Sequence, residues 1–273
     1  MRLLKRLVTY ALLSALALIM VGPFLWLFST ALKSPTEDIF AFPPQLLPQH
    51  PTWANLVAVW QAVPFGQYTW NSVLVSGLSV VLNVLLAALA AYPLARMEFR
   101  GKGAIFVAIL ATMMVPFQVI MIPLFLVCLH LGITDSIAGI VMPTAVSAFG
   151  IFLLRQAYQA IPRELEEAAL IDGCGPLTLW WRVMLPLIRP SLATLAIFTF
   201  VGAWGDFLWP LIIVKDPSRY TLPVGLSMLA GTFSGNWRLV AAGSVLATVP
   251  VIIVFVFLQR YFIGDGTAGA VKG

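Results

Sequence analysis

The sequence predicts an all-α polytopic membrane protein with six transmembrane helices, and three observations lead to this fold class. First, 60% of the 273 residues are hydrophobic and only 10% are charged, whereas soluble domains are about half apolar and a quarter charged. Second, the apolar runs are far too long for barrel strands, so helices must cross the bilayer. Third, if each apolar run crosses the membrane, the connecting segments alternate between its two sides, and most basic residues then lie on one side.

The expected spans differ in regularity. The first follows a basic start, but its apolar run is too long for a signal peptide, so we expect an uncleaved helix with a kink near Gly22-Pro23. In the third span, Pro116 and Pro123 predict further kinks. The expected spans cover residues 7–32, 68–94, 104–126, 136–157, 190–214 and 240–262. Residues 33–66 and 215–238 are expected as external loops, the first with a short surface helix at 53–61.

The distribution of positive charge sets the orientation of these spans. Four basic residues fall in the external loops: Lys33, Lys215, Arg219 and Arg238. The other 12 of the 16 Lys and Arg residues lie in segments assigned to the opposite side. Because cytoplasmic loops carry an excess of Lys and Arg, this asymmetry predicts that both termini lie in the cytoplasm.

A polar segment at residues 161–190 interrupts the apolar sequence between the fourth and fifth spans. Pro162 and the helix formers after it predict a helix over 163–171, with acids in its first turn. Gly173 predicts the end of that helix, because glycine readily adopts the left-handed conformation. A second short helix is expected to begin at Pro176 and to end at the prolines Pro186 and Pro190.

The spacing of this segment resembles the EAA loop of importer-type ABC permeases. The matching residues are Glu167-Ala168-Ala169, then Gly173, then Val183-x-Leu185-Pro186, with Val183 in place of the usual Ile. An ordinary amphipathic loop would explain the charges but not the spacing. The resemblance implies a type I ABC importer permease fold and a surface that docks the ATPase. The residues expected on that surface are Glu166, Glu167, Ala168, Ala169, Leu170, Asp172, Gly173, Pro176, Leu185 and Pro186.

Three further stretches resemble the carbohydrate, maltose-type branch of these permeases. They are AWGDFLWPLI at 203–212, with Gly205 in place of Asn, YTLPVGL at 220–226 and TAGAVKG at 267–273. They point to the smaller, second permease of a heterodimeric pair, whose tail contacts the ATPase through Gly269, Lys272 and Gly273. Asp265-Gly266 departs from the tail pattern. The expected division is a first helix and external loop (1–66), a permease core (67–262) and a cytoplasmic tail (263–273).

The resemblance also implies partners and a location. A homologous permease, two ATP-binding subunits and an external solute-binding protein would complete the importer in a bacterial cytoplasmic (inner) membrane. ATP and Mg²⁺ would be bound by the ATPase, and this chain would hold no cofactor. Consistent with this, the sequence lacks a GxxxxGK[ST] motif. We find no catalytic set, no metal-ligand spacing and no basic stripe for nucleic acid.

Polar residues within the spans are candidates for the translocation pathway. Asp206 either lines the pathway, beside Trp204 and Trp209, or makes a structural hydrogen bond that holds a helix broken at Gly205 and Pro210. A polar stripe on the second span lines the pathway or joins helices, and we favour joining. The stripe consists of Asn71, Ser72, Ser76, Ser79 and Asn83. Aromatic faces and hydrogen-bonding groups would suit a sugar or another polyol.

Other functions remain open alternatives. Glycerol phosphate as cargo would need cationic residues in the pathway, and we find none deep in a span. An ion-coupled secondary transporter would carry buried charges in several spans and internal symmetry, whereas only Asp206 is seen. A third alternative is a structural or sensory membrane subunit without transport. Co-purification with an ATPase would distinguish the importer permease from it.

Overall fold

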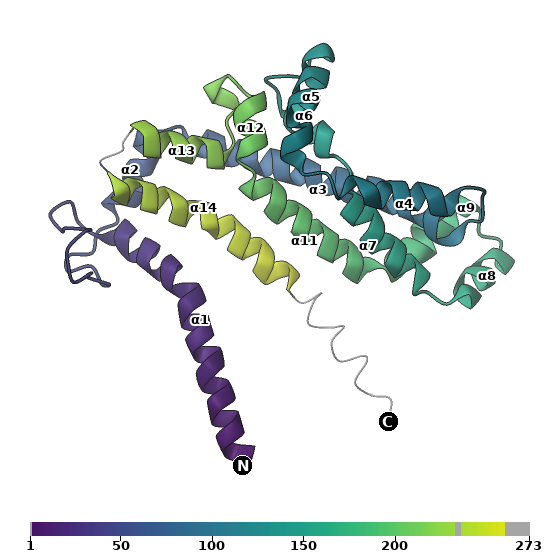
Figure 1. Ribbon diagram of the computed structural model, residues 1–273, viewed down its shortest axis with the longest axis horizontal. Helices are drawn as coiled ribbons and strands as arrows, with labels where there is room; N and C mark the ends of the chain where they lie inside the picture. The colour runs from purple at the N-terminus through teal and green to yellow at the C-terminus, as the bar shows by residue number, and fades with distance from the viewer. Residues whose placement is uncertain (1, 233–235, 260–273) are drawn as a thin grey trace. The chain divides into compact units, whose positions relative to one another are not determined.

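The computed structural model describes residues 2–232 and 236–259, and all regular structure in these ranges is helical (Figure 1). The chain divides into two compact units. One unit comprises residues 1–66 and 224–250, and the other comprises residues 67–223 and 251–273. The all-helical fold class predicted from composition is confirmed.

Three helices are each long and apolar enough to cross a membrane: α1 (Arg2–Leu32), α3 (Phe65–Arg96) and α14 (Trp237–Leu258). Three bent pairs of helices give up to three more spans. The pairs join α4 (Lys102–Thr112) to α5 (Phe117–His130), residues 137–144 to α7 (Ala148–Gln159), and residues 176–187 to α11 (Arg189–Gly205). The prediction of six spans therefore holds, but three of them are broken rather than continuous.

The third span differs most from the prediction. Its two halves meet at 99°, with the break at residues 113–116, and Pro116, whose backbone is extended, immediately precedes α5. A proline at the first turn of a helix is tolerated, since its missing N–H would be unpaired there anyway. Pro123, by contrast, lies inside α5 and does not interrupt it. The kink expected at Pro116 is therefore present and is sharp enough to divide the span, whereas the helix continues through Pro123.

The end of the fifth span and the second external loop also differ from prediction. α11 ends at Gly205, and a separate short helix, α12 (Leu208–Ile213), follows. Residues 215–238, expected as a loop, contain the apolar helix α13 (Leu222–Thr232). A helix in this loop was not predicted from the sequence. α13 is too short to span a bilayer, so span length alone does not reveal it.

In the second unit, the core lies where α3 meets α7 and the segment 161–188. Three alanines of α3, Ala87, Ala88 and Ala91, are at most 1% exposed, and Leu154 and Tyr158 of α7 are fully buried in the same cluster. Small residues let helix backbones approach closely, and this packing holds helices together where lipid removes the hydrophobic driving force. This core fixes the polar segment 161–190 to the ends of the spans.

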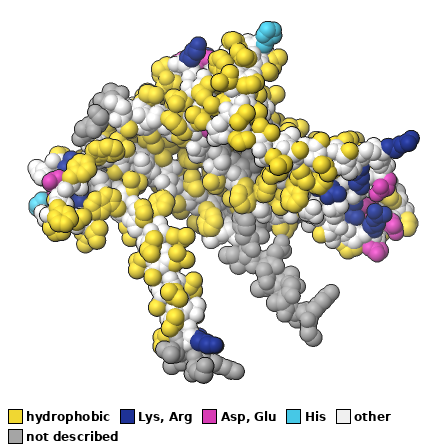
Figure 2. All heavy atoms as spheres, in the orientation of Figure 1, with side chains coloured by type: hydrophobic (Ala, Val, Ile, Leu, Met, Phe, Trp, Pro, Cys, Tyr) yellow, Lys and Arg dark blue, Asp and Glu magenta, His cyan; other side chains and the backbone are white. Residues whose placement is uncertain are grey.

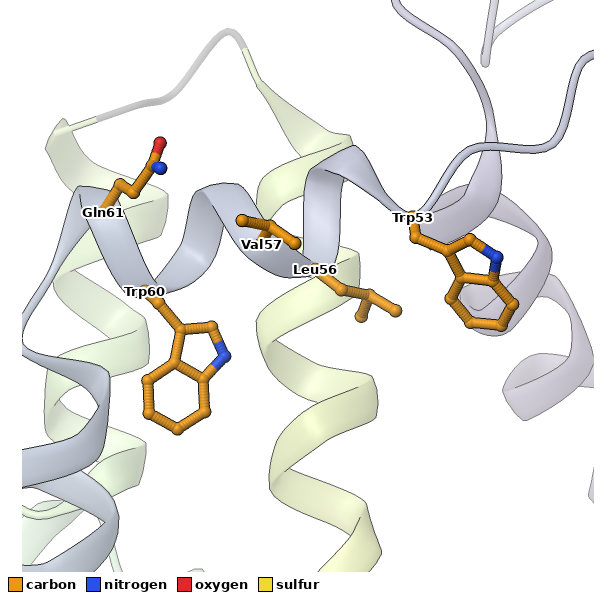
Figure 3. A pocket seen from close by; sticks show the side chains of 5 residues that line it. All are labelled: Trp53, Leu56, Val57, Trp60 and Gln61. Carbon is orange, nitrogen blue, oxygen red and sulfur yellow. The ribbon is translucent and has the colours of Figure 1, made fainter.

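In the first unit, side-chain hydrogen bonds to the backbone hold the loop that follows α1. The Asn55 amide donates to the carbonyls of Ala31 and Lys33, both at 2.8 Å, and so ties α2 (Ala54–Ala62) to the end of α1. The predicted surface helix at 53–61 is confirmed. Figure 3 shows the rings of Trp53 and Trp60 on one side of α2 and the Gln61 amide on the other.

Candidate functional site

The polar segment 161–190 folds as a helix, a glycine turn and a second helical run. The first helix, α8 (Arg163–Ile171), begins after Pro162 and carries Glu164 and Glu166 in its first turn. The second run consists of α9 (Pro176–Leu179), a π-helical turn (Trp180–Met184) and α10 (Leu185–Leu187). Acids near a helix N-terminus are favoured by the helix dipole. The predicted helix boundaries at 163, 171 and 176 are confirmed.

The turn between the helices requires glycine. Gly173 has a φ of +83°, in the left-handed region. Its N–H donates to the Leu170 carbonyl, and the N–H of Cys174 donates to the Ala169 carbonyl, both at 3.0 Å. These are the two bonds of a Schellman motif, which satisfies the last carbonyls of α8. The direction in which the chain leaves α8 is thus set by one residue.

The second helical run does not end at Pro186 and Pro190 in the way that the sequence analysis predicted. Pro186 lies in the first turn of α10, and Pro190 lies in the first turn of α11. The helical path reaches Pro186 because the preceding π-helical turn changes the hydrogen-bond register: the Leu185 N–H donates to the Trp180 carbonyl, five residues back. Pro186 and Pro190 therefore begin helices rather than end one.

The exposed face of α8 and of the glycine turn is the candidate docking surface. Six of the residues predicted from the sequence to lie on the docking surface are exposed: Glu167, Ala168, Leu170, Asp172, Gly173 and Pro176. Ala169 is buried, and Glu166, Leu185 and Pro186 are partly buried. Figure 2 shows charged side chains of both signs around this segment, and the exposed ones include Arg163, Glu164 and Arg182.

Two exposed apolar residues flank the turn, and they were missing from the sequence-based set. Ile171 is 86% exposed and Leu177 is 79% exposed. The apolar residues at helical spacing in the second run are Leu177, Trp180, Trp181, Met184 and Leu185, and only Trp180 and Met184 of these are buried. Ile171 and Leu177 both add exposed apolar area beside the charged residues of the candidate docking surface. In the sequence, only their position on either side of Asp172-Gly173 could have placed these two residues on the docking surface.

The inner side of α8 contacts the end of α3. The Tyr92 hydroxyl donates to Glu166 Oε1 at 2.9 Å, and Arg96 Nε lies 3.6 Å from Glu166 Oε2. Arg96 also donates from its guanidinium to the Ile161 carbonyl. Glu166 and Glu167 are adjacent in sequence, but they lie on different faces of the helix.

The candidate pathway residues are engaged in packing and hydrogen bonds. The Asn71 amide donates to the carbonyls of Ser218 and Tyr220, both at 2.9 Å. Trp209 is fully buried and donates from its indole to the Gly139 carbonyl at 3.1 Å. Trp204 is buried against Phe200. Asn71 and Trp209 thus join segments that are distant in the sequence, whereas Trp204 stacks on a ring of its own helix.

Asp206 lies between α11 and α12. Its Oδ1 accepts a hydrogen bond from the Trp209 N–H at 3.4 Å, close to the first turn of α12. The helix breaks after Gly205 as expected, whereas Pro210 lies inside α12. This geometry corresponds to the structural interpretation of Asp206.

Two further predictions concern the tail and metals. Gly269, Lys272 and Gly273 lie outside the described residues. Within the described part of the chain, no three His, Cys, Asp or Glu residues lie close enough together to hold a metal ion.

Comparison with known proteins identifies the family. The family model described as "Binding-protein-dependent transport system inner membrane component" matches residues 83–264. An arabinooligosaccharide transport system permease of Halalkalibacterium halodurans is 39% identical over 76% of this chain and 75% of its own length. A diacetylchitobiose uptake system permease of Streptomyces coelicolor is 34% identical over 93% of this chain and 92% of its own.

A solved structure agrees with this family. In a crystal structure of a bacterial ABC transporter involved in import of the acidic polysaccharide alginate, one chain is 27% identical to this one. The match covers 95% of this chain and 96% of the other, with a TM-score of 0.82. The protein therefore belongs to the family of binding-protein-dependent transport system inner membrane components, and it is a multi-pass permease subunit of an ABC importer.

Proposed function

We propose that this permease forms half of the pathway of a carbohydrate importer and receives mechanical work through the segment 161–190. The names of its relatives support the cargo class, because the three proteins named above include carriers of an oligosaccharide, an acetylated disaccharide and a polysaccharide.

The observation that carries the coupling role is the exposed face at the glycine turn. Glu167, Asp172, Ile171 and Leu177 project there from a helix pair whose opposite side is packed into the core of the second unit. A surface that combines exposed apolar residues with charges suits a protein partner. The partner we propose is the ATPase subunit, and the residues that dock it are those of this face.

The complete importer would contain four further chains. These are a homologous permease, two ATP-binding subunits that bind ATP and Mg²⁺, and an external solute-binding protein. This chain would bind no cofactor itself, and its tail would add contacts to the ATPase. Closure of the ATPase dimer would move α8 and rock the spans between inward- and outward-facing states.

One experiment tests both parts of the proposal. The complex is reconstituted in liposomes with its binding protein, and ATP hydrolysis and uptake are measured for the solute that the binding protein retains on purification. We expect a sugar or oligosaccharide to stimulate both. Retention of glycerol phosphate would overturn the cargo class, and uptake driven by an ion gradient without ATP would overturn the importer mechanism.

A further inference from the structure

Glu166 makes all of its described contacts on the side of α8 that faces the spans. Tyr92, in the last turns of α3, donates its hydroxyl to one carboxylate oxygen at 2.9 Å. Arg96, one turn further along α3, lies 3.6 Å from the other oxygen. A single carboxylate therefore joins α8 to two successive turns of the longest span.

This contact is not an ordinary surface ion pair. The Arg96 side chain is 5% exposed and that of Glu166 is 19% exposed. A buried charge is costly unless it is paired, so removal of one partner has a larger effect than at an exposed pair. Arg96 also donates to the Ile161 carbonyl, just before α8, while its Nε finds no hydrogen-bond partner among the described residues. The carboxylate of Glu166 is the acidic group beside this buried cation.

The second half of the polar segment reaches the same place. Trp180, in the π-helical turn, donates its indole N–H to the Tyr158 hydroxyl at 3.0 Å. Tyr158, on α7, packs edge to face on Tyr92, with ring centroids 5.4 Å apart. Both tyrosines are buried. The two helical parts of the segment 161–190 are thus linked to α3 and α7 through one pair of aromatic rings.

From this geometry we infer that Glu166 is a positioning residue that transmits the movement of α8 to α3, and that it is not part of the docking surface. The inference rests on the proposed function, in which the ATPase moves α8. Force applied at the exposed face would reach α3 through the Glu166–Tyr92–Arg96 cluster, because packed and hydrogen-bonded contacts move as a unit. Glu167, on the exposed face, would bear on the ATPase itself.

Matched substitutions separate the two roles. Tyr92→Phe removes only the hydroxyl, and Glu166→Gln removes the charge with little change in shape. Glu167→Gln is the control, since it makes the same chemical change one residue away on the exposed face. The full complex is purified and reconstituted with each variant. Three quantities are measured: ATPase subunits retained per permease, solute-stimulated ATP hydrolysis, and solute molecules imported per ATP hydrolysed.

We expect Tyr92→Phe and Glu166→Gln to retain the ATPase but to import at least about tenfold less solute per ATP, the size expected for loss of a hydrogen bond to a charged group. The double variant should be no worse than the more affected single variant, because both changes break one contact. Glu167→Gln should reduce ATPase retention by no more than about fivefold and leave the ratio of import to hydrolysis unchanged. A purely structural role would lower the yield of assembled complex without a change in that ratio.

Three outcomes overturn the inference and leave the proposed function intact. Either Glu166→Gln weakens ATPase retention as Glu167→Gln does, which would make Glu166 a docking residue, or both inner variants keep the wild-type ratio. A fall in assembled complex with a normal ratio in the remainder would equally overturn it. Failure of the proposed function has a different signature: replacement of Gly173 by Val and of Glu167 by Gln would leave ATPase retention and stimulation unchanged.

Discussion

Asn83 on α3 holds the start of α7 through Ser147. Its Oδ1 accepts hydrogen bonds from the Ser147 backbone N–H at 2.9 Å and from the Ser147 hydroxyl at 3.1 Å. Its Nδ2 donates to the Thr199 hydroxyl of α11 at 2.8 Å. Asn83 is 4% exposed, so one buried amide joins three helices of the second unit. The polar stripe on the second span thus contains a residue that joins helices, as we favoured from the sequence.

Replacement of Asn83 by Leu should destabilise the permease. The change removes three hydrogen bonds and leaves the Ser147 N–H without its partner, at a cost of about 1–3 kcal/mol. The measurement is the free energy of unfolding in detergent or lipid. Ser76→Ala on the same helix is the control, because the buried Ser76 hydroxyl has no hydrogen-bond partner among the described residues. Equal losses in the two variants would contradict this assignment.

Glu37 should make the order of the external loop sensitive to acid. Hydrogen bonds from the backbone N–H of Gln49, and then of His50 and Ser34, lower the pKa of Glu37 to about 2, although its burial acts in the opposite direction. A carboxylate whose folded pKa lies below its ordinary value of 4.5 stabilises the loop fully above that value. Its contribution is lost as the pH falls from 4.5 towards 2. The protection of residues 34–50 against hydrogen exchange, corrected for the intrinsic pH dependence of exchange, should therefore fall across this range.

The control for Glu37 is the neighbouring acid. Glu37→Gln should remove most of this acid dependence and accelerate exchange at neutral pH, since an amide is a weaker acceptor of these three bonds. Asp38→Asn should have little effect, because the exposed Asp38 accepts only from the Phe40 N–H among the contacts described. Unchanged exchange in Glu37→Gln at pH 7 would show that the carboxylate does not order the loop.

The sequence predicted those features that depend on local chemistry. Apolar runs located the spans, and Gly173 located a left-handed turn that the structure contains. Bend angles, such as 99° between α4 and α5, depend on tertiary packing, and proline positions alone do not determine them. The faces of α8 were equally undetermined. Glu166 and Glu167 have the same side chain, and only the buried positions of Tyr92 and Arg96 on a distant helix distinguish them.

Asp206→Ala should weaken the start of α12. It removes the acceptor for the Trp209 N–H, and loss of a capping oxygen costs about 0.5–2 kcal/mol. Asp206→Asn keeps an acceptor and should restore most of the stability. Thermal unfolding of the assembled complex and solute uptake are measured together. Uptake lost in both variants, with stability restored in Asp206→Asn, would instead favour a role for the carboxylate in the pathway.

Gly173→Val should uncouple the ATPase from transport without preventing membrane insertion. The φ of +83° is strained for a residue with a Cβ by about 1–2 kcal/mol, so the turn would shift the direction of α9 relative to α8. No described atom lies within 4 Å of a Cβ built at Gly173, so the effect would come from backbone strain and from contact with a partner.

Gly175→Val is the matched control, since Gly175 has equal space and a φ of −68° that any residue adopts. Gly173→Asn should be milder, because asparagine tolerates the left-handed region. ATP hydrolysis stimulated by loaded binding protein is measured, with insertion checked in parallel. Normal stimulation in Gly173→Val, or equal losses in both valine variants, would mean that the left-handed turn is not what couples this segment to the ATPase.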